Sequence, residues 1–135
     1  MNIDEKNLSW VGVDLDGTLA YYDGWRGHEH IGEPIRPMVA LVRKLLNDGV
    51  KVKIFTARVS STSLAYGGVS RDAALKPIYE WSLRHLGRVL EVTCEKDCYL
   101  EKLYDDNAVP VIRNFGAAEC TFLSAMRHAV PAKTK

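Results

Sequence analysis

Short apolar runs alternate along this chain with longer segments in which apolar residues recur every three or four positions. The first run, Ser9 to Leu15, precedes a Gly-rich polar loop and a helix that we predict to begin near Pro37. That helix would bury one face, which consists of Met38, Leu41, Val42, Leu45 and Leu46. A strand followed by a helix and then by another strand is typical of a parallel sheet covered by helices.

The same alternation continues to the end of the chain. We predict strands at Val50 to Phe55, about Val89 to Thr93, Tyr99 to Tyr104 and near Val109 to Ile112, and helices at Arg71 to Leu86 and Ala117 to Ala129. The Ser- and Gly-rich segment Ser60 to Ser70 is predicted to be a loop. The expected fold class is α/β, a single Rossmann-like domain with a mostly parallel five-stranded sheet, helices on both faces and no separate cap domain.

Composition limits the classes of partner. The chain has 135 residues, of which 47% are apolar, enough for one domain over residues 1–135 with its own core. Its 18 basic residues nearly balance 17 acidic ones, so no large field favours nucleic acid. Because the first residues lack a long apolar segment, we expect neither a signal peptide nor a membrane span. An odd set of three cysteines favours reduced thiols and a cytoplasmic protein.

Two carboxylates stand at the end of the first predicted strand, in the sequence Asp14-Leu15-Asp16-Gly17-Thr18. A carboxylate can attack phosphorus and form an acyl phosphate, while a second one nearby donates and removes protons. Gly17 allows the backbone to turn sharply past the pair, and the Thr18 hydroxyl can hydrogen-bond within that turn. The pair therefore suits phosphoryl transfer.

Further polar residues stand at the ends of the later strands. Thr56 follows the second strand, Lys96 follows the third, and Asp105 and Asp106 follow the fourth. In an open parallel sheet the ligand crevice lies beyond the carboxyl ends of the strands. We therefore expect these side chains to share one crevice with the two carboxylates of the first strand.

Together these residues resemble the four motifs of the haloacid dehalogenase superfamily of phosphohydrolases. The match runs from Ser9 to about Val111, and the matching residues are Asp14 and Asp16 in the first motif, Thr56 in the second, Lys96 in the third, and Asp105 and Asp106 in the fourth. The resemblance, to small members without a cap, implies a Mg2+-dependent phosphatase. It would hydrolyse a phosphomonoester of a small phosphorylated substrate through an aspartyl phosphate.

The resemblance also implies a role for each residue. Asp14 would be the nucleophile, and Asp16 would protonate the leaving oxygen and then activate water. Thr56 and Lys96 would hold the phosphoryl oxygens. The ligands implied for Mg2+, a hard cation, are Asp14, the Asp16 main-chain carbonyl, Asp105 and Asp106. Crowded carboxylates repel each other and a phosphate dianion, so elementary electrostatics also calls for a cation there.

The catalytic candidates have structural alternatives. An aspartate at a strand end, such as Asp14, can simply form a turn or a cap, and Thr56 can cap the segment that follows it. Lys102 is a rival of Lys96, but it falls within the fourth predicted strand, away from the crevice.

Two other groups invite a metal interpretation. His28-Glu29-His30 is a trio of metal-binding residue types, although such a trio on a polar loop is more typical of a solvated surface. Cys94 and Cys98 have no second Cys or His pair at zinc-site spacing, so ordinary thiols are favoured.

The segment from Leu19 to Pro34 is too short to form a cap domain, and we expect it to be a flap beside an open crevice. Trp25 and Arg26 in the flap, and Arg58 after the second strand, are candidates for contact with the leaving group. The alternative is that these side chains pack against the scaffold.

Two further functions stay open. A receiver-like signalling module also has acidic residues, a Thr and a Lys on a parallel sheet, but its phosphoacceptor lies on the third strand. Here that strand ends in Cys94-Glu95-Lys96. A phosphatase acting on nucleic-acid ends would suit an open crevice, although the nearly neutral net charge counts against it. The sequence leaves the substrate, an oligomeric state and the direct metal contact of Asp105 or Asp106 undecided.

Overall fold

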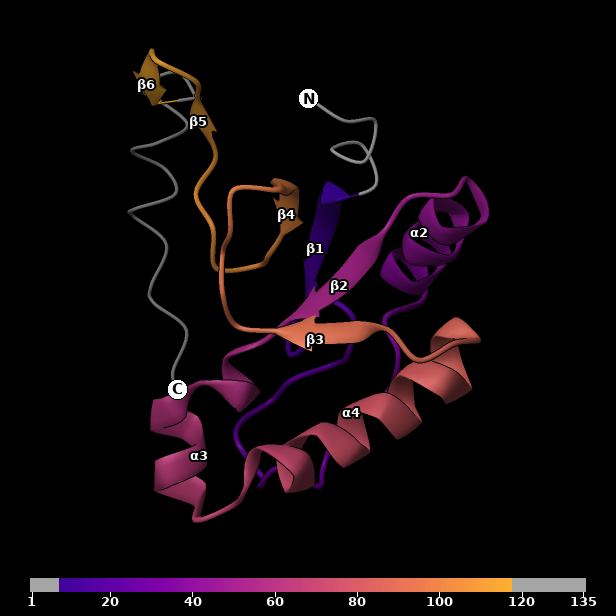
Figure 1. Cartoon of the computed structure of the whole chain (residues 1–135), viewed down its shortest axis with the longest axis vertical. Helices are drawn as coiled ribbons and strands as arrows, with labels where there is room; N and C mark the ends of the chain where they lie inside the picture. The colour runs from indigo at the N-terminus through magenta and orange to yellow at the C-terminus, as the bar shows by residue number, and fades with distance from the viewer. Residues whose placement is uncertain (1–7, 118–135) are drawn as a thin grey trace.

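The computed structural model describes residues 8–117. A parallel sheet of four strands lies at its centre, in the order β3-β2-β1-β4 (Figure 1). The strands are β1 (Trp10–Asp14), β2 (Val52–Phe55), β3 (Glu91–Thr93) and β4 (Leu100–Tyr104). The expectation of an α/β fold with a parallel sheet is confirmed.

Helical segments connect the first three strands. They are α2 (Arg36–Asn47), the 3-10 turn η1 (Ala57–Val59), α3 (Ser61–Gly67) and α4 (Arg71–Leu86). Local signals set the bounds of α4, since the Ser70 side chain accepts a hydrogen bond from Ala73 N and Gly87 ends the helix with a positive φ of 84°. The predicted bounds of this helix are confirmed. Within the described part of the chain, no helix has the length and apolar character needed to cross a membrane.

The main core lies between the sheet and the helices α2 and α4, which also pack against each other. Val13 and Ile54 from the sheet, Val42 from α2 and Ile78 from α4 are fully buried in it. Burial of each such side chain contributes about 1.5–3 kcal/mol. This core fixes β1 in the middle of the sheet and so fixes the position of Asp14 at its end.

The opposite face of the sheet is crossed by the loop between β3 and β4, residues 94–99. Asp97 in this loop accepts a hydrogen bond from Trp10 Nε1 at 2.8 Å and lies 4.0 Å from Lys53 Nζ. Lys53 Nζ in turn lies 4.4 Å from the centre of the Trp10 ring, which is 1% exposed. A connection that runs back across the sheet stays right-handed only on this opposite face. Through its contacts with Trp10 and Lys53, Asp97 anchors the loop that carries Lys96.

The fifth strand predicted for this sheet, near Val109 to Ile112, does not join it in the described part of the chain. β5 (Val111–Ile112) pairs antiparallel with β6 (Gly116–Ala117) in a hairpin that stands apart from the sheet (Figure 1). Asn114, with a φ of 62°, lies in its turn. An apolar run favours a strand but does not specify its partner, and the nearest partner costs the least loop-closure entropy.

One predicted loop contains a helix, and one predicted helix lies almost entirely outside the described residues. The segment predicted as a loop at Ser60 to Ser70 contains α3, whose first turn is capped by Ser60 Oγ accepting from Ser63 N. The helix predicted at Ala117 to Ala129 falls outside the described residues, apart from Ala117, which lies in β6.

Candidate functional site

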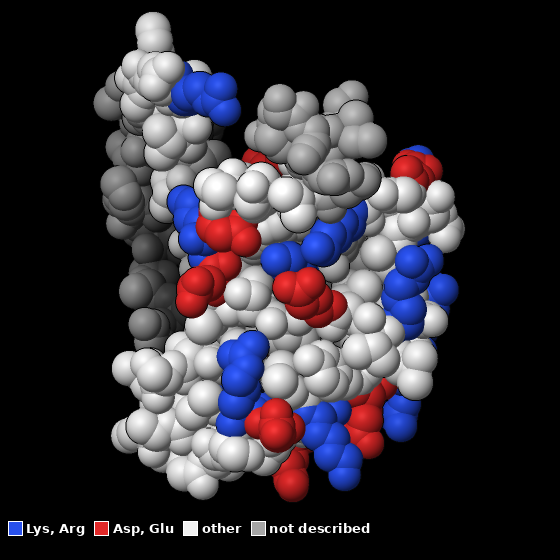
Figure 2. Space-filling model, in the orientation of Figure 1, with Lys and Arg blue, Asp and Glu red and all other residues white. Residues whose placement is uncertain are grey.

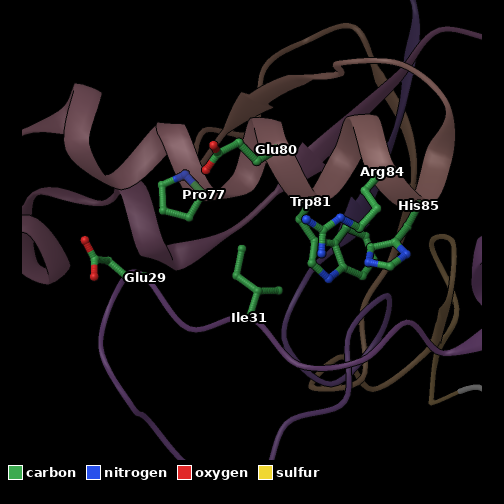
Figure 3. Close-up of a pocket in the computed structure, with 7 residues that line it drawn as sticks. All are labelled: Glu29, Ile31, Pro77, Glu80, Trp81, Arg84 and His85. Carbon is green, nitrogen blue, oxygen red and sulfur yellow. The ribbon is translucent and has the colours of Figure 1, made fainter.

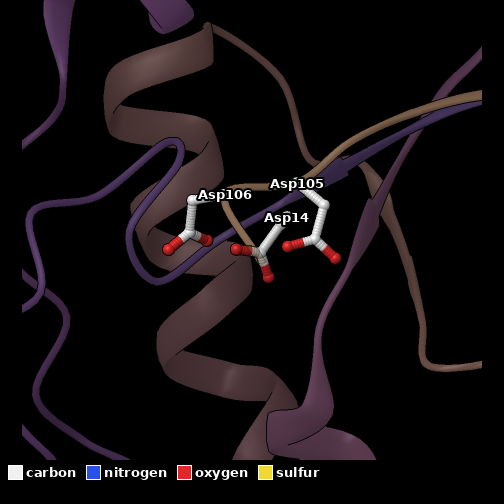
Figure 4. Close-up of side chains that lie close together, drawn as sticks. All are labelled: Asp14, Asp105 and Asp106. Atoms are coloured by element: carbon white, nitrogen blue, oxygen red, sulfur yellow. The ribbon is translucent and has the colours of Figure 1, made fainter. Parts of the chain in front are cut away.

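Three carboxylates meet at the carboxyl ends of β1 and β4. Asp14 is the last residue of β1, and Asp105 and Asp106 directly follow β4, whose pairing places Tyr104 opposite Val13. One carboxylate oxygen from each aspartate lies within 4.8 Å of the other two (Figure 4). We call these three residues the acidic cluster. Their oxygens are the ligand type that Mg2+ prefers, so the donor set fits that cation.

The turn after Asp14 brings the backbone close to Asp106. Gly17 N donates to Ala20 O at 2.8 Å, and Gly17 has a φ of 94°, a conformation that side chains disfavour. A Cβ atom at this position would lie 2.6 Å from Asp106 Oδ2. Glycine is therefore required here both by the backbone conformation and by the space that Asp106 fills.

Thr18 links two members of the acidic cluster. Its hydroxyl lies 3.1 Å from Asp14 Oδ2 and 3.2 Å from Asp106 Oδ1, and it accepts a hydrogen bond from Asp106 N at 3.2 Å. The sequence indicates that the Thr18 hydroxyl can bond within its own turn. Its contact with Asp106 could not be identified from the sequence because the two residues are 88 positions apart in the chain.

The environment of Asp14 disfavours its negative charge. Burial, the hydrogen bond with Asp106 and the charge of Asp105 together raise the pKa of Asp14 to about 8, although the Thr18 hydrogen bond acts in the opposite direction. A divalent cation among the three carboxylates would relieve this repulsion. The three residues of the acidic cluster could therefore hold a divalent cation.

We expect the free energy of unfolding of the metal-free protein to fall as the pH rises from about 4 to about 8. Because the pKa of Asp14 rises from 3.8 to about 8 on folding, the folded state binds this proton more tightly. The stabilisation is complete below about pH 4 and is lost as the pH passes through about 8. Urea unfolding in chelator, with the Asp14→Asn profile subtracted, isolates this contribution. Superimposable profiles for the two proteins would contradict it.

The Asp16 carboxylate points to Arg58 rather than to the acidic cluster. Arg58 Nε donates to Asp16 Oδ2 at 2.7 Å and Nη2 donates to Asp16 Oδ1 at 2.8 Å. The Arg58 side chain is only 4% exposed. The sequence made Arg58 a candidate for contact with the leaving group, whereas the structure places its guanidinium on the predicted acid and base.

The other two catalytic candidates lie at the ends of β2 and β3. Thr56 is 2% exposed, and its Oγ1 accepts a hydrogen bond from Arg58 N at 3.1 Å, so it does cap η1. A hydroxyl that accepts a bond still has its own proton to donate. Lys96 is exposed in the loop 94–99, and no hydrogen bond or ion pair in the described part of the chain joins it to the acidic cluster. Lys102 lies within β4, as predicted.

The flap candidates occupy different environments. The half-exposed Trp25 ring lies 4.8 Å from Arg58 Cζ and packs edge-on against the His28 ring at 4.9 Å. Arg26 pairs at the surface with Asp23 at 2.7 Å. Only Trp25 is therefore held near Asp16, through Arg58.

The alternative metal interpretations gain no support. His28 is buried, and its Nε2 lies 3.1 Å from the Arg58 carbonyl oxygen, so it does not belong to a solvated trio. Cys94 and Cys98 are free thiols. Across residues 8–117, the acidic cluster is the one group of three or more metal-binding side chains gathered closely enough to share an ion.

A separate cavity of about 180 Å³ lies between the flap and α4 (Figure 3). Its walls include Glu29 and Ile31 from the flap and Glu80 and Trp81 from α4. None of the residues predicted to be functional lines it. The cavity is therefore distinct from the site at the strand ends.

The strand-end site brings together three carboxylates that could hold a cation and a fourth carboxylate that is held by an arginine. Such a set is suited to phosphoryl transfer, because negative charge must be neutralised before one anion can attack another. Comparisons of the chain with protein-family models, with curated proteins and with solved structures give no match.

Proposed function

We propose that this protein is a Mg2+-dependent phosphatase that hydrolyses a phosphomonoester through an aspartyl phosphate on Asp14. The Rossmann-like fold and the motif order of the haloacid dehalogenase superfamily, which the sequence resembles, belong to the same proposal. The observation that carries it is the acidic cluster, in which the pKa of Asp14 rises to about 8 when no cation is present. A bound cation would ionise Asp14 and offset the repulsion between its carboxylate and the phosphoryl group.

Asp14 and Asp16 would divide the chemistry between them. An Asp14 oxygen attacks phosphorus, the bond from phosphorus to the ester oxygen breaks, and Asp16 gives its proton to that oxygen. Asp16 then takes a proton from water, which attacks the aspartyl phosphate and releases inorganic phosphate. Arg58 holds Asp16 outside the acidic cluster, and each Asp16 oxygen that accepts one bond from Arg58 keeps a second lone pair, on which the transferred proton would be carried.

Thr56 and Lys96 would bind the phosphoryl oxygens. The Thr56 hydroxyl lies at the end of β2, the strand next to β1, and it retains a proton to donate. Lys96 follows the end of β3 in an exposed loop, and we propose that it turns toward a bound phosphoryl group. Asp97, anchored to Trp10, holds the base of that loop in place.

The same features weigh against the other functions. In a receiver-like module the phosphoacceptor would lie on the third strand, whereas the acids here come from β1 and β4. On the face shown in Figure 2, basic and acidic side chains are interspersed, and the described residues form no broad basic area there. That distribution does not favour a nucleic-acid end over a small phosphorylated substrate.

We expect purified protein to release inorganic phosphate from at least one member of a panel of phosphorylated metabolites, or from p-nitrophenyl phosphate, in the presence of Mg2+. Chelation with EDTA should lower the rate by about 10³-fold or more, equivalent to about 4 kcal/mol of barrier, and added Mg2+ should restore it. Phosphate release that persists in EDTA would sink the proposal, as would a panel without any hydrolysed member.

A further inference from the structure

Arg58 makes more directed contacts than an ion pair with Asp16 requires. Two of its N–H groups bind the Asp16 carboxylate in a fork, at 2.7 and 2.8 Å. Two others donate to the backbone carbonyls of His28 and His30, at 3.0 and 2.7 Å. Four of the five guanidinium donors are therefore used, and the planar group cannot rotate without breaking several bonds at once.

The surroundings of Arg58 hold it in this orientation. The Trp25 ring lies over the guanidinium, and the Arg58 backbone is fixed by the cap from Thr56 and by His28 Nε2. The flap is itself attached to the scaffold, because Trp81 Nε1 on α4 donates to Gly32 O at 2.9 Å. The flap, η1 and α4 thus fix the guanidinium before any ligand binds.

The fixed guanidinium of Arg58 determines where the Asp16 carboxylate can lie relative to a cation in the acidic cluster. Asp16 stands two residues after Asp14, so its carboxylate would be attracted to a divalent cation in the acidic cluster. As a ligand it would strengthen cation binding but could no longer exchange protons freely. The fork of Arg58 occupies one lone pair on each Asp16 oxygen and so competes with the cation for this carboxylate, while the second lone pair of each oxygen stays open to a proton.

We propose that Arg58 is a positioning residue that keeps the Asp16 carboxylate out of the coordination sphere of the cation and oriented for proton transfer. This inference rests on the proposed function, since it concerns the same cation and the same acid. Arg58 then acts on Asp16 and not on the leaving group, for which the sequence made it a candidate.

The test is a double-mutant cycle on Mg2+ binding, measured by calorimetry. Arg58→Gln and Asp16→Asn are made separately and together. If Arg58 restrains Asp16, Arg58→Gln tightens Mg2+ binding about tenfold more when Asp16 is present than in the Asp16→Asn background. Equal tightening in the two backgrounds would mean that Arg58 acts through its charge alone, and this result would overturn the proposal, as would no tightening in either.

Arg58→Lys provides a second variant that keeps the charge and most of the volume but lacks the fork. It should show the same dependence on Asp16 with a smaller amplitude, and it carries the test if Arg58→Gln does not fold. Arg43→Gln is the matched control, because Arg43 donates to the His85 carbonyl at 3.1 Å in a different part of the molecule. This control should leave Mg2+ affinity unchanged.

Turnover supplies an independent measurement. Arg58→Gln should lower kcat more than it changes KM, with a larger loss for alkyl phosphates than for p-nitrophenyl phosphate, whose leaving group hardly needs a proton. It should cause no further loss in the Asp16→Asn background. If the wild-type protein binds Mg2+ but hydrolyses no phosphomonoester, the proposed function fails. The double-mutant cycle on Mg2+ binding still tests whether Arg58 restrains Asp16. If it binds no Mg2+, both are overturned.

Discussion

Asp14→Asn is expected to lower turnover of the phosphomonoester by about 10⁴-fold or more, the scale seen when a catalytic nucleophile is removed. The amide keeps the shape of the side chain but cannot form the aspartyl phosphate. The same change should leave the metal-free protein as stable as the wild type or more stable at neutral pH. The reason is that the raised pKa of Asp14, about 8, reflects an unfavourable environment for its charge.

Loss of activity with retained stability separates a chemical role from a structural one. Thermal unfolding in EDTA and phosphate release in Mg2+ should therefore be measured on the same samples. Asp48→Asn is a suitable control, because Asp48 pairs with Lys44 on the exposed surface of the molecule. Near-normal turnover in Asp14→Asn would refute the role of Asp14 as the nucleophile. An equal loss of turnover in Asp48→Asn would show that the assay does not report on this site.

Gly17→Ala should have the second largest effect, on both stability and cation binding. The alanine would have to adopt a φ of 94°, and its Cβ would lie 2.6 Å from Asp106 Oδ2. We expect a loss of about 2–4 kcal/mol in the free energy of unfolding. Because Asp106 must move away, Mg2+ affinity should fall by at least about tenfold.

Gly27→Ala is a closely matched control for this substitution. Gly27 has a φ of 97°, but a Cβ there would meet no atom within 4 Å. It should therefore lose only the backbone contribution, about 1–2 kcal/mol, and keep its affinity for Mg2+. Urea unfolding and calorimetric titration of both variants give the comparison. Equal Mg2+ affinities in the two variants would contradict the close approach of Gly17 to Asp106.

The parts of the fold that follow from local signals could be predicted from the sequence. The bounds of α4 follow from the capping Ser70 and from Gly87, and the end of β1 follows from an apolar run that stops at Asp14. α3 was missed because none of its residues is buried, so no apolar periodicity marks it. The apolar run at Val109 to Ile112 contains a strand but gave no sign that its partner was β6.

The site was predictable to the same extent. Asp14, Asp105 and Asp106 come together because parallel strands place their carboxyl ends at one edge, which is a general property of such sheets. The bond between Arg58 and Asp16 could not be deduced, because it depends on how η1 and the turn after β1 are oriented. An arginine close to an acidic site has the same sequence signature whether it faces the substrate or another side chain.

The order of the strands decides when the site can come into existence. The acidic cluster joins β1, near the beginning of the chain, to the residues after β4. Of the four strands of the sheet β4 comes last along the chain, and within residues 8–117 it pairs with β1 alone, at the edge of the sheet. While the chain emerges from the ribosome, β1, β2 and β3 leave it before the later two aspartates do, and they can begin to assemble with α2 and α4 first. During that interval the nascent domain has a core but no place for an ion.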